Sequence, residues 1–305
     1  MQNQISSQEG HISVTGGRVW YRVVGGGNAI PLLVLHGGPG VPHDYLEPLA
    51  ALADERPVIF YDQLGCGKSD RPDDLSLWHI ERFVEELGQV RQALGLERIH
   101  LLGHSWGGWL ATEYMLTRPV GIVSLVMASS NFSLPRYQAV ARRAIAALPP
   151  EIQSVIHQHE AAGTTDSVAY QQAVEEVTQH FLCLLQPYPE PLRRAGAGMG
   201  MDVYVTMQGP NEFTVTGNLK DWERTESAHE IATPTLFTYG RHEPMYDEAQ
   251  YSHGLLPGAE TVVFEQSAHM AHLEETERYL QVLREFLARA ENRFTAQPVV
   301  DGGSQ

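Results

Sequence analysis

The sequence predicts an α/β fold in which a mostly parallel sheet carries helices on both faces. Apolar runs of strand length alternate with helical patterns through residues 1–130, and the same rhythm returns after residue 232; such alternation is typical of parallel sheets. Between these parts the rhythm stops, because residues 131–228 contain helical patterns and no buried-strand run. We therefore expect a core domain built from residues 1–130 and 229–292, with residues 131–228 inserted as a helical cap.

The first part of the core begins with residues 1–10, which are polar and expected to be frayed. Alternating strand residues on both sides of Gly16-Gly17 predict a hairpin over 11–26. The run PLLVL is continuously apolar and predicts a buried strand that ends in the glycine-rich loop 36–40. The next expected elements are a short helix at 45–53, a strand from Pro57, and a helix at 78–96 with apolar residues at helical spacing.

The cap contains three helix candidates, at 139–148, 151–162 and 169–185. In the core, apolar runs predict strands at 121–129, 233–240 and 260–269, and an amphipathic last helix that includes residues 279–287. Residues 293–305 are expected to be a disordered tail.

Residues 98–116 carry the strongest chemical signal. A strand pattern ends in Gly103-His104-Ser105-Trp106-Gly107, and a helix pattern follows directly. A G-x-S-x-G turn between a strand and a helix is the nucleophile elbow of an α/β-hydrolase. Glycines are needed there because the strained turn brings the strand and the helix close together. The alternative, a structural turn with an incidental serine, does not explain this placement, so we predict Ser105 as the nucleophile.

A serine nucleophile needs a general base, and the base needs an orienting acid. In α/β-hydrolases the acid and then the histidine follow the serine along the chain. His269 stands at the end of the last predicted strand, whereas His272 is expected at the start of the final helix. Glu243 follows strand 233–240 more closely than Asp247, which could instead be a helix N-terminal acid. We predict His269 as the base and Glu243 as the acid.

Another place for the acid lies after strand 121–129, but Ser129, Ser130 and Asn131 offer no carboxylate there. The oxyanion of the reaction needs backbone donors, which we expect from the N–H of Trp106 and from the loop 36–40. That glycine-rich loop could also be no more than a tight structural turn.

The composition narrows the functional classes. The chain has 305 residues, a formal net charge of −16 and a pI of about 5.3, which argues against nucleic-acid binding. The long-range field could favour cationic substrates, although solubility explains the charge more simply. Two cysteines, no signal-peptide pattern and no membrane-length apolar stretch predict a cytoplasmic protein with reduced thiols and no membrane association. The segment Gly65–Ser69 resembles a phosphate-binding loop, but Asp62 occupies the position of its first glycine.

Several motifs together resemble the proline iminopeptidase family, in particular the tricorn-interacting aminopeptidase and the amino-acid amidases. They are HGGPG (36–40), YDQLGCGKSD (61–70), GHSWGG (103–108), MQGPNEF (207–213), GNLKDW (217–222) and SAHMAHLEE (267–275). The resemblance covers residues 10–290 and implies a serine hydrolase with a helical cap, without cofactor or metal. It implies cleavage of N-terminal residues, proline or other small or apolar ones, from short peptides or amino-acid amides. It also implies that Gly38 and Trp106 donate to the oxyanion and that Glu212 binds the substrate ammonium.

One departure from the family concerns the residues after strand 233–240. The family usually carries an aspartate followed by a glutamate, and this chain has Glu243-Pro244. Pro244 removes a carboxylate that helps to hold the amine in relatives, unless Asp247 or another acid replaces it. An esterase or lactonase acting on a neutral acyl substrate is therefore the alternative function. An inert ligand receptor would not need so complete a site, and hydrolases that use an elbow aspartate are disfavoured by Ser105.

Overall fold

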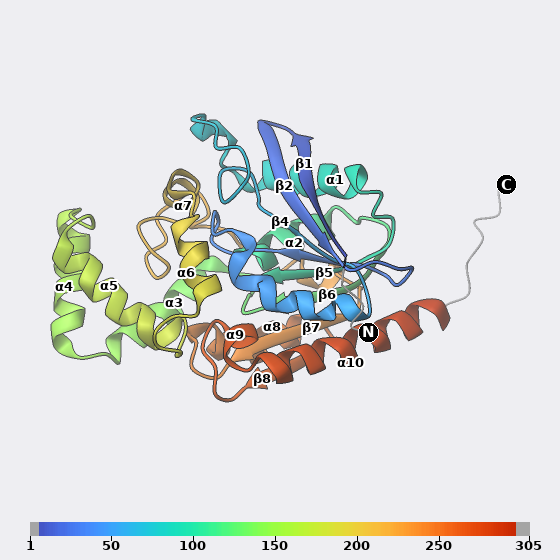
Figure 1. The fold of residues 1–305 in the computed structure, drawn as a ribbon. Coiled ribbons are helices and arrows are strands. Elements are labelled where there is room, and N and C mark those ends of the chain that lie inside the picture. The colour runs from blue at the N-terminus through green and yellow to red at the C-terminus, as the bar shows by residue number, and fades with distance from the viewer. Residues whose placement is uncertain (1–5, 297–305) are drawn as a thin grey trace.

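The computed structural model describes residues 6–296 and contains an eight-stranded sheet in the order β1-β2-β4-β3-β5-β6-β7-β8 (Figure 1). Strand β2 pairs antiparallel with β1 and β4, and all other neighbouring strands are parallel, so the predicted mostly parallel sheet is confirmed. The strands are β1 (Ser7–Val14), β2 (Gly17–Val24), β3 (Leu32–Leu35), β4 (Val58–Tyr61), β5 (Ile99–His104), β6 (Ile122–Ala128), β7 (Thr235–Gly240) and β8 (Glu260–Phe264).

The predicted hairpin is present but starts earlier than we expected. Strand β1 begins at Ser7, which lies opposite Val24, so the prediction of a frayed segment is wrong for residues 7–10. Pairing with β2 supplies these residues with backbone hydrogen bonds, which their polar side chains do not reveal. Gly16 has a φ of 98° between the two strands, a conformation that favours glycine. Residues 1–5 lie outside the described part of the chain.

Helices cover both faces of the sheet, as predicted. Strand residues alternate between two apolar clusters: Leu101 packs with the cluster that includes α1 and α2, and Leu102 packs with the cluster that includes η1 and α10. This period-two alternation is what buries both faces of a parallel sheet. Each fully buried aliphatic side chain contributes roughly 1.5–3 kcal/mol. The core helices are α1 (Ile80–Ala93), α2 (Trp106–Leu116), α8 (Ala249–Leu255), α9 (Ala271–Glu274) and α10 (Thr276–Ala296), with 3₁₀ helices η1 (His43–Asp54), η2 (Leu75–Leu77), η3 (Ala228–Glu230) and η4 (Pro244–Glu248).

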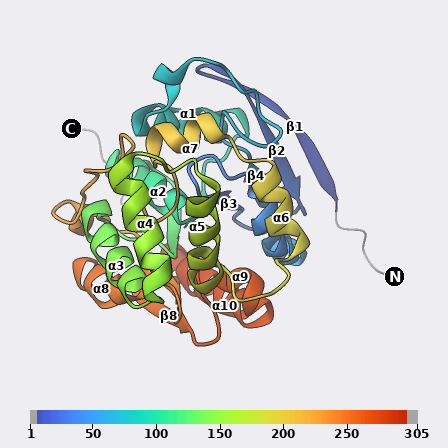
Figure 2. The same cartoon turned by 90° about the vertical axis from the view of Figure 1, so that its left-hand side faces the viewer.

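Five helices occupy the segment that we expected to be a cap, and Figure 2 shows them spread across the front of the sheet. The sequence suggested three of them. The two that it missed, α6 and α7, lie in a stretch rich in glycine and proline, which local propensity disfavours as helix. Tertiary contacts hold α6 in place, because Arg194 pairs with Asp44 and Glu47 on η1. The five are α3 (Leu134–Ala146), α4 (Pro150–Ala162), α5 (Val168–Phe181), α6 (Glu190–Ala197) and α7 (Met201–Met207).

Three further expectations need correction. The helix expected at 45–53 is the 3₁₀ helix η1, which contains Pro48; proline has no N–H for an α-helical hydrogen bond. His272 lies on the separate helix α9 and not at the start of the final helix. The final helix continues to Ala296, so the prediction of disorder is wrong for residues 293–296, and residues 297–305 lie outside the described part.

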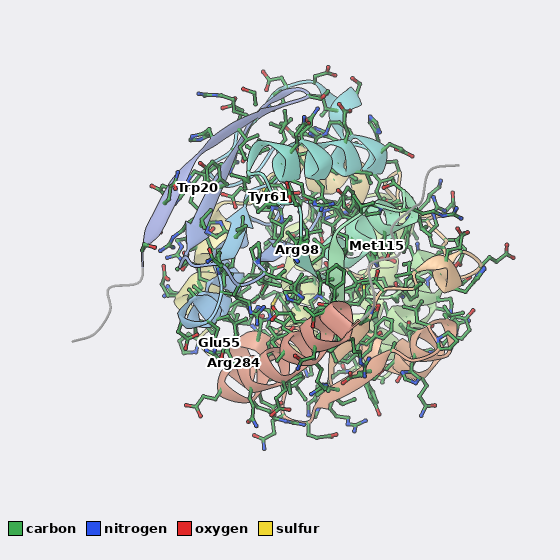
Figure 3. All side chains as sticks on the ribbon, turned by 90° about the vertical axis from the view of Figure 1, so that its right-hand side faces the viewer. Trp20, Glu55, Tyr61, Arg98, Met115 and Arg284 are labelled. Carbon is green, nitrogen blue, oxygen red and sulfur yellow. The ribbon has the colours of Figure 1, made fainter. Side chains whose placement is uncertain are left out.

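The last helix is tied to the end of η1 at the surface. Arg284 donates to Asp54 at 2.8 Å and pairs with Glu55 (Figure 3). Exposed pairs of this kind contribute about 0–1 kcal/mol each, so the apolar face of α10 supplies most of its attachment. No helix within residues 6–296 combines the length and the apolar character that crossing a bilayer would require.

Candidate active site

Ser105 lies at the tight turn between β5 and α2, with a φ of 55° and a ψ of −122°. A positive φ at a non-glycine residue is strained and is typical of functional sites. A Cβ atom on Gly103 would lie 2.2 Å from the carbonyl oxygen of Gly107, and one on Gly107 would lie 2.3 Å from that of Leu35. Only glycine fits these two positions, so the local sequence produces the turn that presents Ser105.

The imidazole of His269 lies next to the carboxylate of Glu243. His269 Nδ1 is 2.6 Å from Glu243 Oε2, and both side chains are buried. The carboxylate accepts this hydrogen bond, so Nδ1 carries the proton and Nε2 is left to accept one. Burial lowers the pKa of His269. The charge and hydrogen bond of Glu243, together with the charge of Glu212, raise this pKa by more than burial lowers it, so it lies above its ordinary value.

The two competing residues lie elsewhere. The side chain of Asp247 is 58% exposed, and its carboxylate is 3.6 Å from Arg143 on α3. His272 is buried and its Nε2 bonds the backbone carbonyl of Tyr45 at 3.1 Å, while burial lowers its pKa to about 3. A neutral histidine that bonds a carbonyl is committed to the structure, so the geometry favours His269 and Glu243 for the catalytic roles.

A second set of contacts holds Glu243. Its Oε1 accepts hydrogen bonds from the backbone N–H of Gly240 at 2.9 Å and from the hydroxyl of Ser129 at 2.8 Å. Ser129 has a φ of 48° and stands directly after β6. The sequence offers no carboxylate at this position, and we did not predict that the Ser129 hydroxyl would hold the carboxylate that follows the neighbouring strand β7.

Two backbone N–H groups can donate to an oxyanion. Within residues 6–296, neither Gly38 nor Trp106 has a protein acceptor for its N–H. Trp106 is the first residue of α2, where helical N–H groups lack partners. Gly38 has a φ of 112°, and a Cβ atom there would lie 2.6 Å from the nitrogen of Gly40. The neighbouring N–H of Gly37 is already used, because it donates to Tyr45.

Tyr45 and His104 connect the glycine-rich loop 36–40, the turn at Ser105 and the segment that carries His269. Gly37 donates to the Tyr45 oxygen at 2.7 Å, Tyr45 lies 3.0 Å from His104 Nδ1, and His104 Nε2 lies 2.9 Å from the carbonyl of His269. A carbonyl only accepts, so Nε2 carries the proton and the tyrosine hydroxyl donates to Nδ1. Burial lowers the pKa of His104 well below its ordinary value, which keeps the ring neutral. These contacts fix the loop 36–40, which carries Gly38, relative to His269.

One cavity of about 420 Å³ is lined by most of these residues and by side chains of the segment 131–228. Its lining includes Ser105, His269 and Glu243 from the core and Glu212 from the cap segment. The side chain of Glu212 accepts hydrogen bonds from Tyr204 at 3.3 Å and from Tyr137 at 3.4 Å. The structure thus brings the candidate ammonium anchor and the candidate nucleophile to the same cavity.

The ionised form of Glu212 is destabilised by burial and would be stabilised by a nearby cation. Burial raises the pKa of its carboxyl group, although His269 and the hydroxyls of Tyr204 and Tyr137 oppose the rise. A ligand ammonium would favour the ionised carboxylate. The sequence did not identify the two tyrosines. Tyr137 on α3 is far from Glu212 along the chain, and Tyr204 on α7 is near in sequence but faces Glu212 only after folding.

Pro244 places an apolar ring where the proline iminopeptidase family usually has a second acid after the triad carboxylate. Pro244 lines the cavity, and Asp247 does not, so Asp247 does not replace the lost carboxylate. The remaining acidic residue in the lining is Glu175 on α5, whose side chain is exposed. Near the nucleophile, Glu212 is therefore the carboxylate left to meet a ligand cation, apart from Glu243, which is already engaged by His269.

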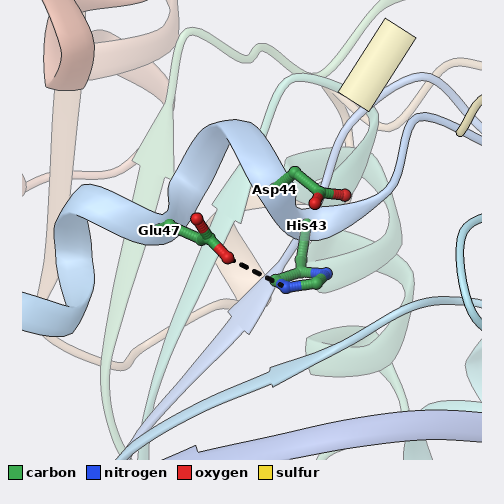
Figure 4. A group of neighbouring side chains, drawn as sticks. All are labelled: His43, Asp44 and Glu47. Carbon is green, nitrogen blue, oxygen red and sulfur yellow. Dashed lines mark ion pairs between the residues drawn. The ribbon is translucent and has the colours of Figure 1, made fainter. Parts of the chain in front are cut away.

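Outside this cavity, His43, Asp44 and Glu47 form a cluster whose geometry could suit a metal ion (Figure 4). Its polar groups already have partners. His43 Nδ1 bonds Asp62 at 2.7 Å, and Arg194 pairs with both carboxylates of the cluster. These contacts account for the cluster as an ion-pair network that joins η1 to α6.

Comparisons with known proteins show which family the chain resembles in sequence and fold. Residues 30–276 match a family model described as the alpha/beta hydrolase fold. The proline iminopeptidase of Heyndrickxia coagulans is 47% identical over 92% of this chain and 98% of its own length. Among solved structures, VinJ has a TM-score of 0.88 and 34% identity over 93% of this chain and 99% of its own. The proline iminopeptidase of Mycobacterium smegmatis has a TM-score of 0.85 and 35% identity, covering 94% and 99% respectively.

Proposed function

Because this chain belongs to the proline iminopeptidase family of α/β-hydrolases, we propose that it is a serine aminopeptidase that removes an N-terminal proline, or another small apolar residue, from short peptides or amino-acid amides. The observation that carries this proposal is the placement of the Glu212 carboxylate in the same cavity as Ser105 and His269. An exopeptidase of this kind needs a group that binds the free amine at a fixed position relative to the nucleophile.

The proposed reaction begins when Ser105 Oγ attacks the carbonyl carbon of the first residue and His269 Nε2 takes the hydroxyl proton. The N–H groups of Gly38 and Trp106 hold the negative oxygen of the tetrahedral intermediate. Glu243 stabilises the imidazolium, which then gives its proton to the leaving amine. Water, deprotonated by the same histidine, attacks the acyl-enzyme; the histidine then returns this proton to Ser105 Oγ, and the amino acid is released.

Glu212 is the proposed anchor for the substrate amine. An N-terminal proline carries a secondary ammonium with two N–H donors, and the carboxylate can accept from them in a charge-assisted hydrogen bond. The apolar side chains of Phe213 and Met245 line the same cavity and can pack against a small apolar ring. The cavity volume of about 420 Å³ lies in the range of small-molecule sites, roughly 300–1,000 Å³.

The decisive experiment compares four substrates with purified enzyme: prolyl arylamide, alanyl arylamide, N-acetylprolyl arylamide and an amine-free ester of similar size. We expect the free-amine arylamides to have the highest kcat/KM and N-acetylation to remove most turnover. A higher kcat/KM for the amine-free ester would overturn the aminopeptidase assignment in favour of an esterase or lactonase. Pro244 supports the esterase or lactonase alternative, because without a carboxylate at position 244 a substrate amine would have Glu212 as its anchor and no second one there.

We also propose that the protein works in the cytoplasm on small-molecule or short-peptide substrates. Both cysteines, Cys66 and Cys183, are buried free thiols, which accords with a reducing compartment. Fractionation of the producing cells, followed by detection with an antibody, tests the location.

A further inference from the structure

The outer part of the catalytic cavity carries a charge that the proposed reaction does not use. The lining residues near the reacting groups, such as Ser105 and His269, are buried, whereas Gln171, Glu175 and Arg193 are exposed and belong to the cap helices α5 and α6. These exposed residues mark the side of the cavity that opens to solvent. Arg193 is the only arginine or lysine among the lining residues.

The guanidinium of Arg193 has no partner within the described part of the chain. Neither a hydrogen bond nor an ion pair engages its side chain among residues 6–296, whereas the adjacent Arg194 pairs with Asp44, Glu47 and Glu190. The contacts of Arg194 with Asp44 and Glu47 attach α6 to η1 and so fix the backbone that carries Arg193. The rim of the cavity therefore presents a free guanidinium on an anchored helix.

The charged side chains of the lining differ between its two ends. Glu212 and Glu243 lie with the reacting groups, whereas the exposed end carries Arg193 together with the acidic Glu175. An inner carboxylate and an outer guanidinium thus line the same cavity. A short peptide has the complementary arrangement, with an ammonium at one terminus and a carboxylate at the other. Guanidinium is the side-chain group best suited to bind a carboxylate, because its two parallel N–H groups match the two oxygens. Glu175, on α5, would repel a carboxylate and so favours its placement toward α6.

We propose that Arg193 binds the free α-carboxylate of a di- or tripeptide whose amino terminus lies at Glu212, which makes the enzyme selective for very short peptides with a free C-terminus. This inference rests on the proposed aminopeptidase function. Glu212, Ser105 and Arg193 line one cavity of about 420 Å³, a size typical of small-molecule sites, so a peptide that contacts both ends must be short. In a protein with a net charge of −16, such a cation would offset the long-range repulsion of an anionic substrate terminus.

The test compares kcat/KM for prolylalanine and for its C-terminal amide in the wild type and in Arg193→Gln. We expect the wild type to prefer the free acid, and Arg193→Gln to lower kcat/KM for the acid about 10-fold to 100-fold more than for the amide, the factor of a charged hydrogen-bonded pair. Arg193→Lys keeps the charge but not the planar fork and should retain part of the preference. Arg142→Gln removes an equal charge from an exposed residue of α3 outside this cavity and should leave the preference intact.

Four results would overturn the inference. Equal kcat/KM for acid and amide in the wild type, or equal losses on both in Arg193→Gln, would show that Arg193 does not contact the carboxylate, while the aminopeptidase function would stand. Loss of the preference in Arg142→Gln to the same extent would assign it to net charge. Failure of the wild type to cleave either peptide or prolyl arylamide, with turnover of the amine-free ester, would reject the proposed function and this inference with it.

Discussion

The hydroxyl of Ser129 donates a 2.8 Å hydrogen bond to one oxygen of Glu243, and the other oxygen of the same carboxylate lies 2.6 Å from His269 Nδ1. The carboxylate is thus held from both sides, because Gly240 also donates to the oxygen that Ser129 contacts. This arrangement fixes the plane of the carboxylate and, through it, the orientation of the imidazole. We therefore propose that Ser129 is a positioning residue that acts on the reaction through Glu243.

Ser129→Ala should lower kcat/KM for prolyl arylamide about 10-fold to 100-fold, because a hydrogen bond to a charged group is worth about 1.5–3 kcal/mol. The adjacent Ser130 provides a matched control. It is equally buried, but within residues 6–296 its hydroxyl has no hydrogen-bond partner, so Ser130→Ala should change kcat/KM less than about twofold. Steady-state kinetics on both variants, with circular dichroism as a check of folding, decides the matter. Equal effects of the two substitutions would contradict a specific role of Ser129.

Ser105→Ala should abolish nearly all turnover while the fold is retained. Loss of a triad serine lowers kcat by about 10⁴ to 10⁶, and alanine at 105 removes only the hydroxyl from an already strained turn. Labelling by a fluorophosphonate should disappear in the same variant. If Ser105→Ala kept a tenth of the wild-type activity, another residue would have to be the nucleophile.

Glu243→Gln should lower kcat by about 10⁴, since an amide favours the wrong tautomer of the histidine, whereas Asp247→Asn should change kcat little. The pH profile gives a second readout. Glu243 raises the pKa of His269, and the base is active when neutral, so kcat/KM falls as the pH drops below that pKa. Removing the charge lowers the pKa, and the acidic limb should move to lower pH. A larger loss in Asp247→Asn than in Glu243→Gln would refute this assignment of the acid.

Glu212→Gln should separate substrates by their amine. For prolyl or alanyl arylamide, kcat/KM should fall, because the loss of a partly desolvated charge pair raises the transition-state free energy by about 2–4 kcal/mol. An amine-free ester should be nearly unaffected, since it never makes this contact. The measurement is kcat/KM for both substrate classes in wild type and variant. Losses of equal size on the two classes would mean that Glu212 supports the cavity structurally and does not bind the amine.

Some features of this protein follow from short stretches of sequence. The turn at Ser105 depends on Gly103 and Gly107, which stand within two residues of it, because the close approach of strand and helix excludes a Cβ there. The parallel sheet follows from apolar runs that alternate with amphipathic helices. Local pattern failed for α6, where glycine and proline disfavour a helix and ion pairs of Arg194 with η1 hold it.

Other features depend on the tertiary structure. The contact of Ser129 with Glu243 joins residues 114 positions apart and exists because β6 and β7 lie side by side in parallel. The two tyrosines that hold Glu212 lie on α3 and α7. Arg193, whose guanidinium has no partner in the described part of the chain, lies on α6. The sequence by itself determined the backbone of the elbow and the order of the candidate catalytic residues, because steric demands act between neighbours in the chain. Only the folded structure decided which distant hydroxyls and charges face those residues, because their partners are set by how strands pair and how the cap packs.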